Sequence, residues 1–512
     1  MLNASLTDEN TTTSKAQEKI SDDSTDNNNN ADDGEEHKRL GGYSPLSTLV
    51  RLSPGPLISQ IVNSLYGVID SMWVSKFIGE IGLTALSLAY ILDNSALSFG
   101  FFIAIAASSQ ISYLFSKKKY DEVSHLSVDL LKICVIFAVI VPTILFPCAR
   151  PLFKFIGGTG KVNDLAFDYA IPLLSLNLIT CCYHCVCGIL QAEGRTWLYG
   201  GAQIISMILN MALFDPLLLW SIKRTLGSSL ATEISMFIPA SIIMTFMFFG
   251  KFSTKPSKKY IFKCFCPETG AALNAGLSAF IMNISISLPA LILQKFIAVR
   301  ANRVGEYDMI VAAYNAISRI YTVSTCVPIA INAAYLPAAS YAFGKKDYKR
   351  LLWLTFHAEW MAMLWGFICM VIIVTLPKQI CSIWSNDERF LYWCNEIVPP
   401  SFYIQFLTPT KFIIVSLLQA SQQTVLATIT SFVTELGILP LAACIFHYTG
   451  DPNSPRRIFY SYPLSDALST VCSILVALKT FINFYRLSKK QDDKTHNMGD
   501  DSNDHELNVL MV

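Results

Sequence analysis

The chain has 512 residues, of which 52% are hydrophobic and only 15% are charged, and its mean hydropathy is +0.42. Soluble globular proteins carry about 25% charged residues, so this balance is typical of a membrane protein. The formal net charge of +1 argues against a nucleic-acid partner, which needs a basic face. We therefore expect the lipid bilayer as a partner, and no nucleic acid.

The two ends of the chain differ from its middle. The N-terminal segment contains "SDDSTDNNNNADDGEEHKRLGG", a polar and acidic stretch that cannot bury enough apolar surface to fold. No apolar segment precedes it, so we expect no cleaved signal peptide. The sequence predicts disordered cytoplasmic tails at residues 1–45 and 489–512, with a membrane domain between them.

Apolar stretches of about twenty residues, the length that crosses a bilayer as a helix, recur through the middle of the chain. Twelve spans are predicted, near residues 55–78, 83–114, 127–149, 167–191, 197–221, 228–250, 271–297, 308–337, 351–376, 396–419, 424–447 and 460–485. The expected fold is all-α. It has a six-helix lobe at 46–250, a basic cytoplasmic linker at 251–267 and a second six-helix lobe at 268–488.

The two halves resemble each other at an offset of 228 residues. "ISYLFSKKKYDE" (111–122) aligns with "ASYAFGKKDYKR" (339–350), with six identities in the first ten positions. The same offset aligns "GILQAEGRT" (188–196) with "SLLQASQQT" (416–424). Because each unit holds an even number of helices, the halves are expected to be parallel repeats.

The distribution of Lys and Arg predicts sidedness. Loops on the two faces carry nearly equal numbers, about 13 and about 12. The cytoplasmic side is normally the richer in Lys and Arg, so residues flanking the first and last spans decide the prediction. These residues are Lys38, Arg39, Arg51, Arg486, Lys489 and Lys490. We expect a multi-pass membrane protein, functional as a monomer, with both termini in the cytoplasm.

Asp70 lies inside the first span, in "NSLYGVIDSMWV" (63–74), with no Lys or Arg within one helical turn. A carboxylate in hydrocarbon costs about 2.5–3.5 kcal/mol on insertion scales, and such groups mark ion pathways and proton relays. Tyr66 and Asn63 lie on the same helical face. Two interpretations stay open: a protonatable or ion-binding group facing the bundle interior, or a solvated carboxylate near the interface.

The fifth span, "ISMILNMALFDPLLLW" (205–220), contains a second candidate group. It holds Asn210 and Asp215, followed by Pro216. Proline frees a backbone carbonyl in the preceding turn, which is useful where a cation or proton binds. Alternatively, Asp215 merely lies near the outer interface.

The other intramembrane charges lie in both halves. Asp93 of the second span either lines the substrate cavity or pairs with Arg319 of the eighth. Lys411 of the tenth span follows Pro409 and lies about eight residues from its nearer end. It is therefore a snorkelling, an ion-paired or a functional residue. Glu435 lies in the eleventh span.

Several chemistries lack sequence support. "CCYHCVCG" (181–188) groups four Cys around His184, but on one helix these side chains point around the axis and build no metal site. The chain has no GxxxxGK[ST], HExxH or GxSxG motif, so we expect neither ATP-driven pumping nor enzyme activity, and no cofactor. Most cysteines lie in apolar runs, where cysteine behaves as a small hydrophobe, so a disulfide framework is not expected.

Together these features resemble the multidrug and toxic compound extrusion (MATE) transporters, over nearly all of residues 50–488. The pieces that carry the resemblance are "LYGVIDSMWVSKFIGEIGLTALSLA" (65–89), "SYLFSKKKYDEV" (112–123), "LQAEGRT" (190–196), "LNMALFDPLLLW" (209–220), "SLATEIS" (229–235) and "LPAASYAFGKKDY" (336–348). The first is the most telling, because the family's first helix carries its Asp in that setting.

The resemblance implies two six-helix lobes around a central cavity, with alternating access driven by an H+ or Na+ gradient. In similar members a cation-coupling site in the N-terminal lobe uses an Asp of helix one, an Asn and an Asp of helix five, and a Thr of helix six. These positions correspond here to Asp70, Asn210, Asp215 and Thr232.

The second lobe departs from the family pattern. Other members carry acids in helices seven and ten, whereas this chain has Asn283 in helix seven, and Thr408 and Lys411 in helix ten. Coupling is therefore expected in the N-terminal lobe. We expect Tyr66, Asp93, Asn283 and Lys411 to line the substrate cavity.

The expected function is antiport, the export of small organic compounds, cationic or amphipathic, in exchange for H+ or Na+. Two alternatives stay open. A flippase for lipid-linked oligosaccharides shares the 6+6 plan but needs a strongly basic cavity, and this chain has few intramembrane cations beyond Arg319 and Lys411. A membrane-embedded transferase needs a His or acid cluster at a membrane face, and the sequence shows none.

Overall fold

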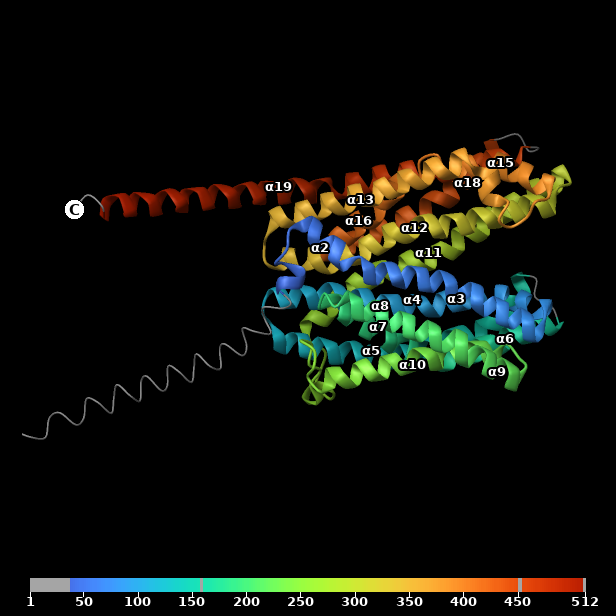
Figure 1. Cartoon of the computed structure of the whole chain (residues 1–512), viewed down its shortest axis with the longest axis horizontal. Coiled ribbons are helices and arrows are strands. Elements are labelled where there is room, and N and C mark those ends of the chain that lie inside the picture. Colours follow the sequence, from blue (N-terminus) through green and yellow to red (C-terminus); the bar gives the residue numbers. More distant parts are fainter. Residues whose placement is uncertain (1–36, 157–159, 450–453, 510–512) are drawn as a thin grey trace, which may run out of the picture.

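The fold is a bundle of long helices in two layers. The computed structural model describes residues 37–156, 160–449 and 454–509, and the regular elements assigned within these ranges are all helices. In Figure 1 the helices of the first half form one layer and those of the second half form the other, with their long axes side by side.

The predicted spans are all present, in order. The first half contains α3 (Pro54–Ile78), α4 (Glu80–Ser116), α5 (Tyr120–Ile156), α6 (Gly160–Ser175), α7 (Asn177–Ala192), α8 (Thr196–Leu209), η1 (Asn210–Phe214), α9 (Asp215–Ile222) and α10 (Leu226–Phe248). The second half contains α11 (Pro267–Val304), α12 (Tyr307–Gly344), α13 (Tyr348–Thr375), α14 (Pro377–Cys381), α15 (Glu388–Phe402), η3 (Gln405–Leu407), α16 (Thr408–Ala420), α17 (Thr424–Ser431), η4 (Phe432–Gly437), α18 (Ile438–Thr449), η5 (Pro455–Tyr460) and α19 (Ser461–Val509).

The number of membrane-crossing helices agrees with the prediction. In the part of the chain that the structure describes, nine helical spans are long and apolar enough to cross a bilayer, and the bent pair α6–α7 makes ten. The long helices α3 and α11, of 25 and 38 residues, complete the predicted twelve.

The internal repeat is visible in the backbone. Lys118 and Lys346, which are 228 positions apart, both adopt left-handed φ values, of 57° and 61°. Gly194 and Gln422, at the same offset, both do so as well, with φ values of 69° and 61°. Matching αL residues at matching helix ends confirm the duplication that the sequence predicts.

Each half also breaks its fourth helix at the same place. Pro172 lies in α6, and α7 starts at Asn177 after a bend of 54°. At the equivalent position Pro400 lies near the end of α15, and the helix resumes at Thr408 after the short turn η3. Broken helices at membrane depth are tolerated where protein or a cavity surrounds the freed backbone groups.

The repeated Lys-rich turns lie at one end of the bundle, together with the start of the described chain. Nζ of Lys345 is 3.0 Å from Nδ1 of His37, and His37 is also within electrostatic range of Lys118. The C-terminal part of α19 lies at the same end in Figure 1. The two halves are therefore parallel, as predicted.

The two lobes touch at this terminal end. The ring of Tyr113 in α4 lies 6.2 Å from that of Phe343 in α12, measured between centroids. Gly344 leaves no room for a side chain, because a Cβ there would lie 1.7 Å from Oγ of Ser116. The two lobes are thus in close contact at the terminal end.

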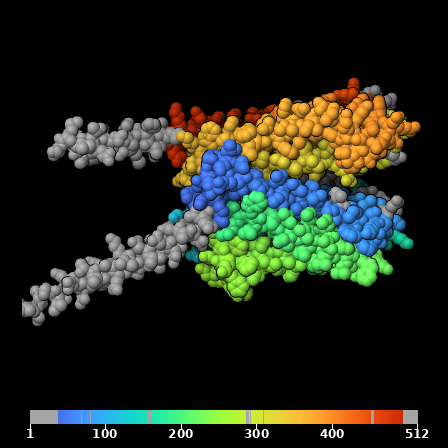
Figure 2. Space-filling model, viewed as in Figure 1, coloured from blue at the N-terminus to red at the C-terminus, as the bar shows by residue number. Residues whose placement is uncertain are grey.

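Structured residues lie ahead of residue 45, where the predicted N-terminal tail ends. Residues 1–36 lie outside the described part, but Leu40 is fully buried and α2 (Pro45–Leu52) packs on α12 and α13. Figure 2 shows this segment in blue against the orange surface of the second lobe. Leu40 and its apolar neighbours directly follow a long acidic stretch, which is why the sequence predicted a disordered tail up to residue 45. At the other end, α19 continues past Lys489 to Val509 as a helix, where a tail without regular structure was expected.

Arg350 of α13 fixes this N-terminal segment. Its guanidinium donates to the carbonyls of Tyr43 and Leu40, at 2.6 and 3.0 Å, and to the Thr48 hydroxyl at 2.9 Å. Hydrogen bonds from a charged group contribute about 1.5–3 kcal/mol, so Arg350→Ala should lower the thermal midpoint of the detergent-solubilised protein by several degrees. Arg350→Lys should recover part of the loss, because it keeps the charge but not the planar fork. An unchanged midpoint in Arg350→Ala would contradict this role.

Candidate functional site

Buried acids lie in the interior of the first lobe. Asp70 of α3 is 5% exposed, and Asp215 at the start of α9 is fully buried. Ser228 of α10 donates a hydrogen bond to Asp70, and Nδ2 of Asn210 donates to Oδ1 of Asp215 at 3.3 Å. Asp70 is also a charged neighbour of Asp215. The two acids therefore face the bundle interior, and the alternative of solvated interfacial carboxylates does not fit their burial.

The fifth helix widens next to these acids. Residues 210–214 form a π-helical turn directly before Asp215 and Pro216. Nε1 of Trp73 in α3 donates to the carbonyl of Met211 at 3.1 Å, so a carbonyl of the widened turn is bound by the neighbouring helix. Single π turns occur frequently at functional sites.

Thr232 and Tyr66 lie beside the acids. The Thr232 hydroxyl donates to the carbonyl of Ser228 at 3.2 Å, which places Thr232 one turn after the residue that binds Asp70. The Tyr66 hydroxyl lies next to that of Thr232 and 3.2 Å from Oγ of Ser235. The four residues matched to the coupling site, together with Tyr66, thus cluster where α3, the fifth helix and α10 meet.

Asp93 of α4 extends the group toward the second lobe. Its charged neighbour is Asp70, whereas the Arg319 side chain is exposed, so the alternative in which Asp93 pairs with Arg319 is wrong. The adjacent Asn94 donates through Nδ2 to the backbone carbonyl of Asn283 at 3.1 Å, across the lobe boundary. Nδ2 of Asn283 donates a hydrogen bond to the carbonyl of Ala279, one turn earlier in the same helix, at 2.9 Å.

Sequence reasoning missed a fourth acid, Glu233 of α10, which is fully buried. Oγ1 of Thr180 in α7 donates to its Oε1 at 2.8 Å, while Oε2 has no hydrogen-bond partner among the described residues. Asp93 is its charged neighbour. A signal was present, since Glu233 is the one acid in the predicted span 228–250.

We call Asp70, Asp93, Asp215 and Glu233 the N-lobe acids. Among the residues that the structure describes, no Lys or Arg is a charged neighbour of any of them. Carboxylates this close together in a low-dielectric interior cannot all be ionised without a counter-charge. The group is therefore suited to take up protons or a small cation. Across the described ranges, the N-lobe acids and residues 181–188 included, no three His, Cys, Asp or Glu side chains converge as metal ligands.

The second lobe has a different electrostatic arrangement. Lys411 of α16 is 7% exposed, and its Nζ lies 3.1 Å from the Glu435 carboxylate in η4. Asp466 of α19 and Tyr321 of α12 lie within electrostatic range of Lys411. Lys411 is thus an interior, ion-paired group and does not snorkel. Asp466 was missed from the sequence, because its proximity to Lys411 depends on helix packing.

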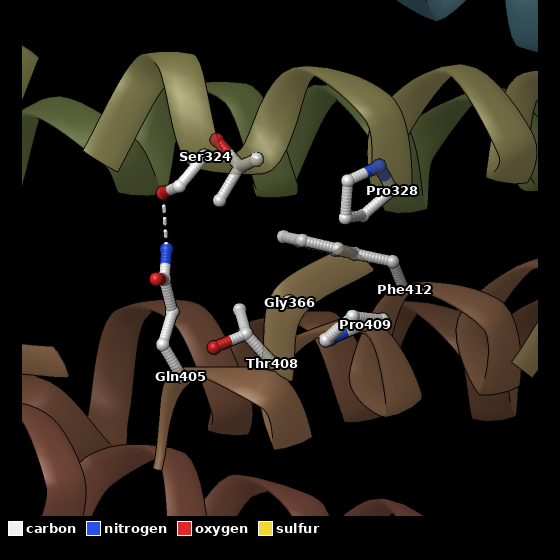
Figure 3. A pocket seen from close by; sticks show the side chains of 8 residues that line it. Ser324, Pro328, Gly366, Gln405, Thr408, Pro409 and Phe412 are labelled. Atoms are coloured by element: carbon white, nitrogen blue, oxygen red, sulfur yellow. Dashed lines mark hydrogen bonds between the residues drawn. The ribbon is translucent and has the colours of Figure 1, made fainter. Parts of the chain in front are cut away.

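A small cavity with a mixed polar and apolar lining lies at the break of the tenth helix, beside the residues that precede and follow Lys411. In Figure 3 the Gln405 amide points to Ser324 across this cavity, and the two are hydrogen-bonded. Its volume of about 10 Å³ is close to that of one water-sized sphere. It is lined by Ser324, Thr325, Pro328, Gly366, Gln405, Thr408, Pro409 and Phe412. Oε1 of Gln405 is buried without a hydrogen-bond partner in the described part, whereas the Thr408 hydroxyl lies next to the Asp466 carboxyl.

Comparison with known proteins assigns this arrangement to a family. The MatE family model matches residues 56–214 and 279–443, which lie one in each lobe. The chain belongs to the MatE family. The match covers more than half of the chain, and its two parts correspond to the two repeats.

Curated relatives of this MatE protein include two staphylococcal proteins. Multidrug export protein MepA of Staphylococcus saprophyticus is 22% identical over 447 residues, which are 84% of this chain and 92% of that protein. MepA of Staphylococcus aureus is 20% identical over 444 residues, or 82% of this chain and 90% of that protein.

Solved structures confirm the twelve-helix MATE fold. A MOP superfamily transporter from Pyrococcus furiosus superposes with a TM-score of 0.79 at 19% identity, over 88% of this chain and 98% of that one. An outward-facing multidrug resistance MATE family transporter gives a TM-score of 0.77 at 20% identity, over 87% and 97% of the two chains.

Proposed function

We propose that this MatE protein is a secondary antiporter that exports small organic compounds, cationic or amphipathic, in exchange for H+ or Na+. The observation that carries the proposal is the group of N-lobe acids, with Asp70, Asp215 and Glu233 buried and Asp93 half-buried, and with no basic neighbour among the described residues. The names of its curated relatives, multidrug export proteins, support export as the direction. Members of the family are transporters, which supports the expectation that the chain is not an enzyme.

Coupling would act through Asp70 and Asp215, with Asn210 and Thr232 beside them. Uptake of a proton or Na+ removes the uncompensated charge and changes the hydrogen bonds that Ser228 and Asn210 make. Because α3 packs on both α8 and α12, a shift of α3 reaches both lobes. Exchange results only if the cation binds one conformation more tightly than the other, since equal affinity shifts no equilibrium.

Alternating access fits the contacts between the lobes. They touch at the terminal end through Tyr113, Phe343 and Gly344, so substrate entry from that side requires these contacts to separate. With both termini in the cytoplasm, the described conformation is closed to the cytoplasm. A monomer contains both lobes and therefore all the parts that this cycle needs.

The substrate cavity would lie between the lobes, near Tyr66, Asp93, Asn283 and Lys411. Asp93 provides an acid that can attract an organic cation, and Asn94 beside it already contacts the second lobe. Lys411 would repel or orient cationic substrates from the other side. Because Glu435 neutralises Lys411, the interior is not strongly basic, which disfavours a flippase for lipid-linked oligosaccharides.

Sidedness can be tested independently of transport. Cysteines introduced at Lys118 and Lys346 should both be protected from a membrane-impermeant maleimide in intact cells, because both turns face the cytoplasm. A cysteine at Asn386, in the exposed turn after α14, should be labelled above the wild-type background. Opposite accessibility of positions 118 and 346 would contradict the parallel arrangement.

The export function is tested by accumulation of a fluorescent organic cation in cells. Cells with the wild-type chain should retain less dye than cells with Asp70→Asn, and ionophores that collapse the H+ and Na+ gradients should abolish the difference. A difference that persists without gradients and requires ATP would contradict secondary transport.

A further inference from the structure

Two buried thiols meet at the end of the bundle that is opposite the termini. Cys381 is the last residue of α14, and Cys394 lies in the second turn of α15. Both are fully buried in the same apolar cluster, and each thiol is the nearest titratable neighbour that acts on the other. α14 packs against α15, so the two cysteines lie on helices that are neighbours in space, as a disulfide between them requires.

The position of this pair in the membrane follows from the helix that precedes it. α13 starts at Tyr348, beside the Lys-rich turn at the terminal end, and runs the length of the bundle to Thr375. In Figure 1, α15 accordingly lies at the end opposite α2 and the C-terminal part of α19. With the termini in the cytoplasm, Cys381 and Cys394 lie on the exoplasmic side, where disulfides form and persist.

We propose that Cys381 and Cys394 form a disulfide in the mature protein. The two thiols lose two protons and two electrons as the S–S bond forms, and the electrons reduce a protein disulfide of the exoplasmic folding compartment to two thiols. Since both side chains are buried in the folded chain, the bond forms before the α14–α15 turn packs. This proposal rests on the sidedness given under Proposed function, and not on the transport activity.

The compartment, rather than contact alone, decides which thiols react. Cys134 of α5 also contacts Cys182 and Cys185 of α7. These three lie inside membrane-spanning helices of the first lobe, away from aqueous oxidants, and should remain thiols. A single exoplasmic bridge is consistent with the expectation that the chain has no disulfide framework, because most of the other cysteines lie in apolar runs.

The bridge can be detected in the full-length protein. Cells are lysed in N-ethylmaleimide to block free thiols, and the purified protein is digested without reductant for mass spectrometry. We expect a linked peptide pair that contains Cys381 and Cys394, with Cys134, Cys182 and Cys185 alkylated. Reductant should lower the thermal midpoint of the wild type by several degrees, to that of the Cys381→Ser/Cys394→Ser variant, which should itself not respond.

Alkylation of both Cys381 and Cys394 in most molecules would overturn the proposal. Labelling of the exposed Cys264, in the linker between the lobes, shows which premise failed. If an impermeant maleimide reaches Cys264 only in permeabilised cells, the sidedness is right and the thiols do not react. If it reaches Cys264 in intact cells, the sidedness itself is wrong, and transport by the N-lobe acids remains a separate question.

Discussion

Asp70→Asn should abolish gradient-driven efflux while the protein still inserts and folds. Asparagine keeps the size of the side chain and can still bond the Ser228 hydroxyl, but it cannot gain or lose a proton. Because the ion gradient then acts on no ionisable group at this position, we expect the initial rate under an imposed gradient to fall to the rate measured without a gradient. The measurement is dye efflux from proteoliposomes under an imposed pH or Na+ gradient.

The matched control for this change is Asp121→Asn, the same substitution at a side chain that is 87% exposed and outside the membrane. It should transport at the wild-type rate. Asp70→Asn should still bind substrate at least in part, because the change removes the coupling charge and leaves the cavity intact. Wild-type efflux by Asp70→Asn would show that Asp70 is not the coupling group.

Lys411→Gln should change the substrate profile and also lower stability. Removal of one partner from a buried ion pair leaves the other charge uncompensated, which costs about 3–5 kcal/mol. The Lys411–Glu435 pair, at 3.1 Å, is largely buried, so Glu435→Gln should be similarly costly. We expect a lower thermal midpoint in either single variant, and a folded protein whose relative rates for organic cations and neutral compounds differ from the wild type.

The double variant Lys411→Gln/Glu435→Gln separates the two effects. It should recover much of the stability, because two amides can bond each other and the charge of Glu435 is removed together with that of Lys411. Its substrate profile should nevertheless remain altered, since the ammonium is absent. If all three variants transport every tested substrate as the wild type does, Lys411 has a structural role only.

Hydropathy predicted the helices of this protein well, for a physical reason. Every backbone polar group in hydrocarbon must be satisfied within its own segment, so apolar runs of sufficient length become helices. The repeat was equally predictable, because Lys118 and Lys346 lie in turns of similar sequence. The backbones of these two turns have the same left-handed conformation. Composition did not predict that residues 37–52 are structured. Their structure depends on contacts with Arg350, which lies about three hundred residues later in the chain.

The site was only partly predictable. Asp70 and Asp215 are conspicuous as lone charges in apolar runs, and their burial fits that prediction. Glu233 and Asp466 are also charged residues within predicted spans, but the sequence analysis did not single them out. The charged neighbour of Glu233 is Asp93 and that of Asp466 is Lys411, and both neighbours lie on other helices. The partners of a buried charge depend on how helices rotate against each other, which a single sequence does not specify. The pairing of Asp93 with Arg319 was wrong for the same reason, because the sequence does not specify which face each of the two helices turns inward.

The central claim is that a cation gradient drives export by this chain without ATP. The most direct measurement is transport of a fluorescent organic cation in proteoliposomes that contain the purified protein and no nucleotide, with pH and Na+ gradients imposed separately. The account predicts substrate movement against its own gradient, opposite to the imposed H+ or Na+ gradient, and its loss in Asp70→Asn. Movement that only follows the substrate's own gradient, whatever ion gradient is imposed, would contradict it.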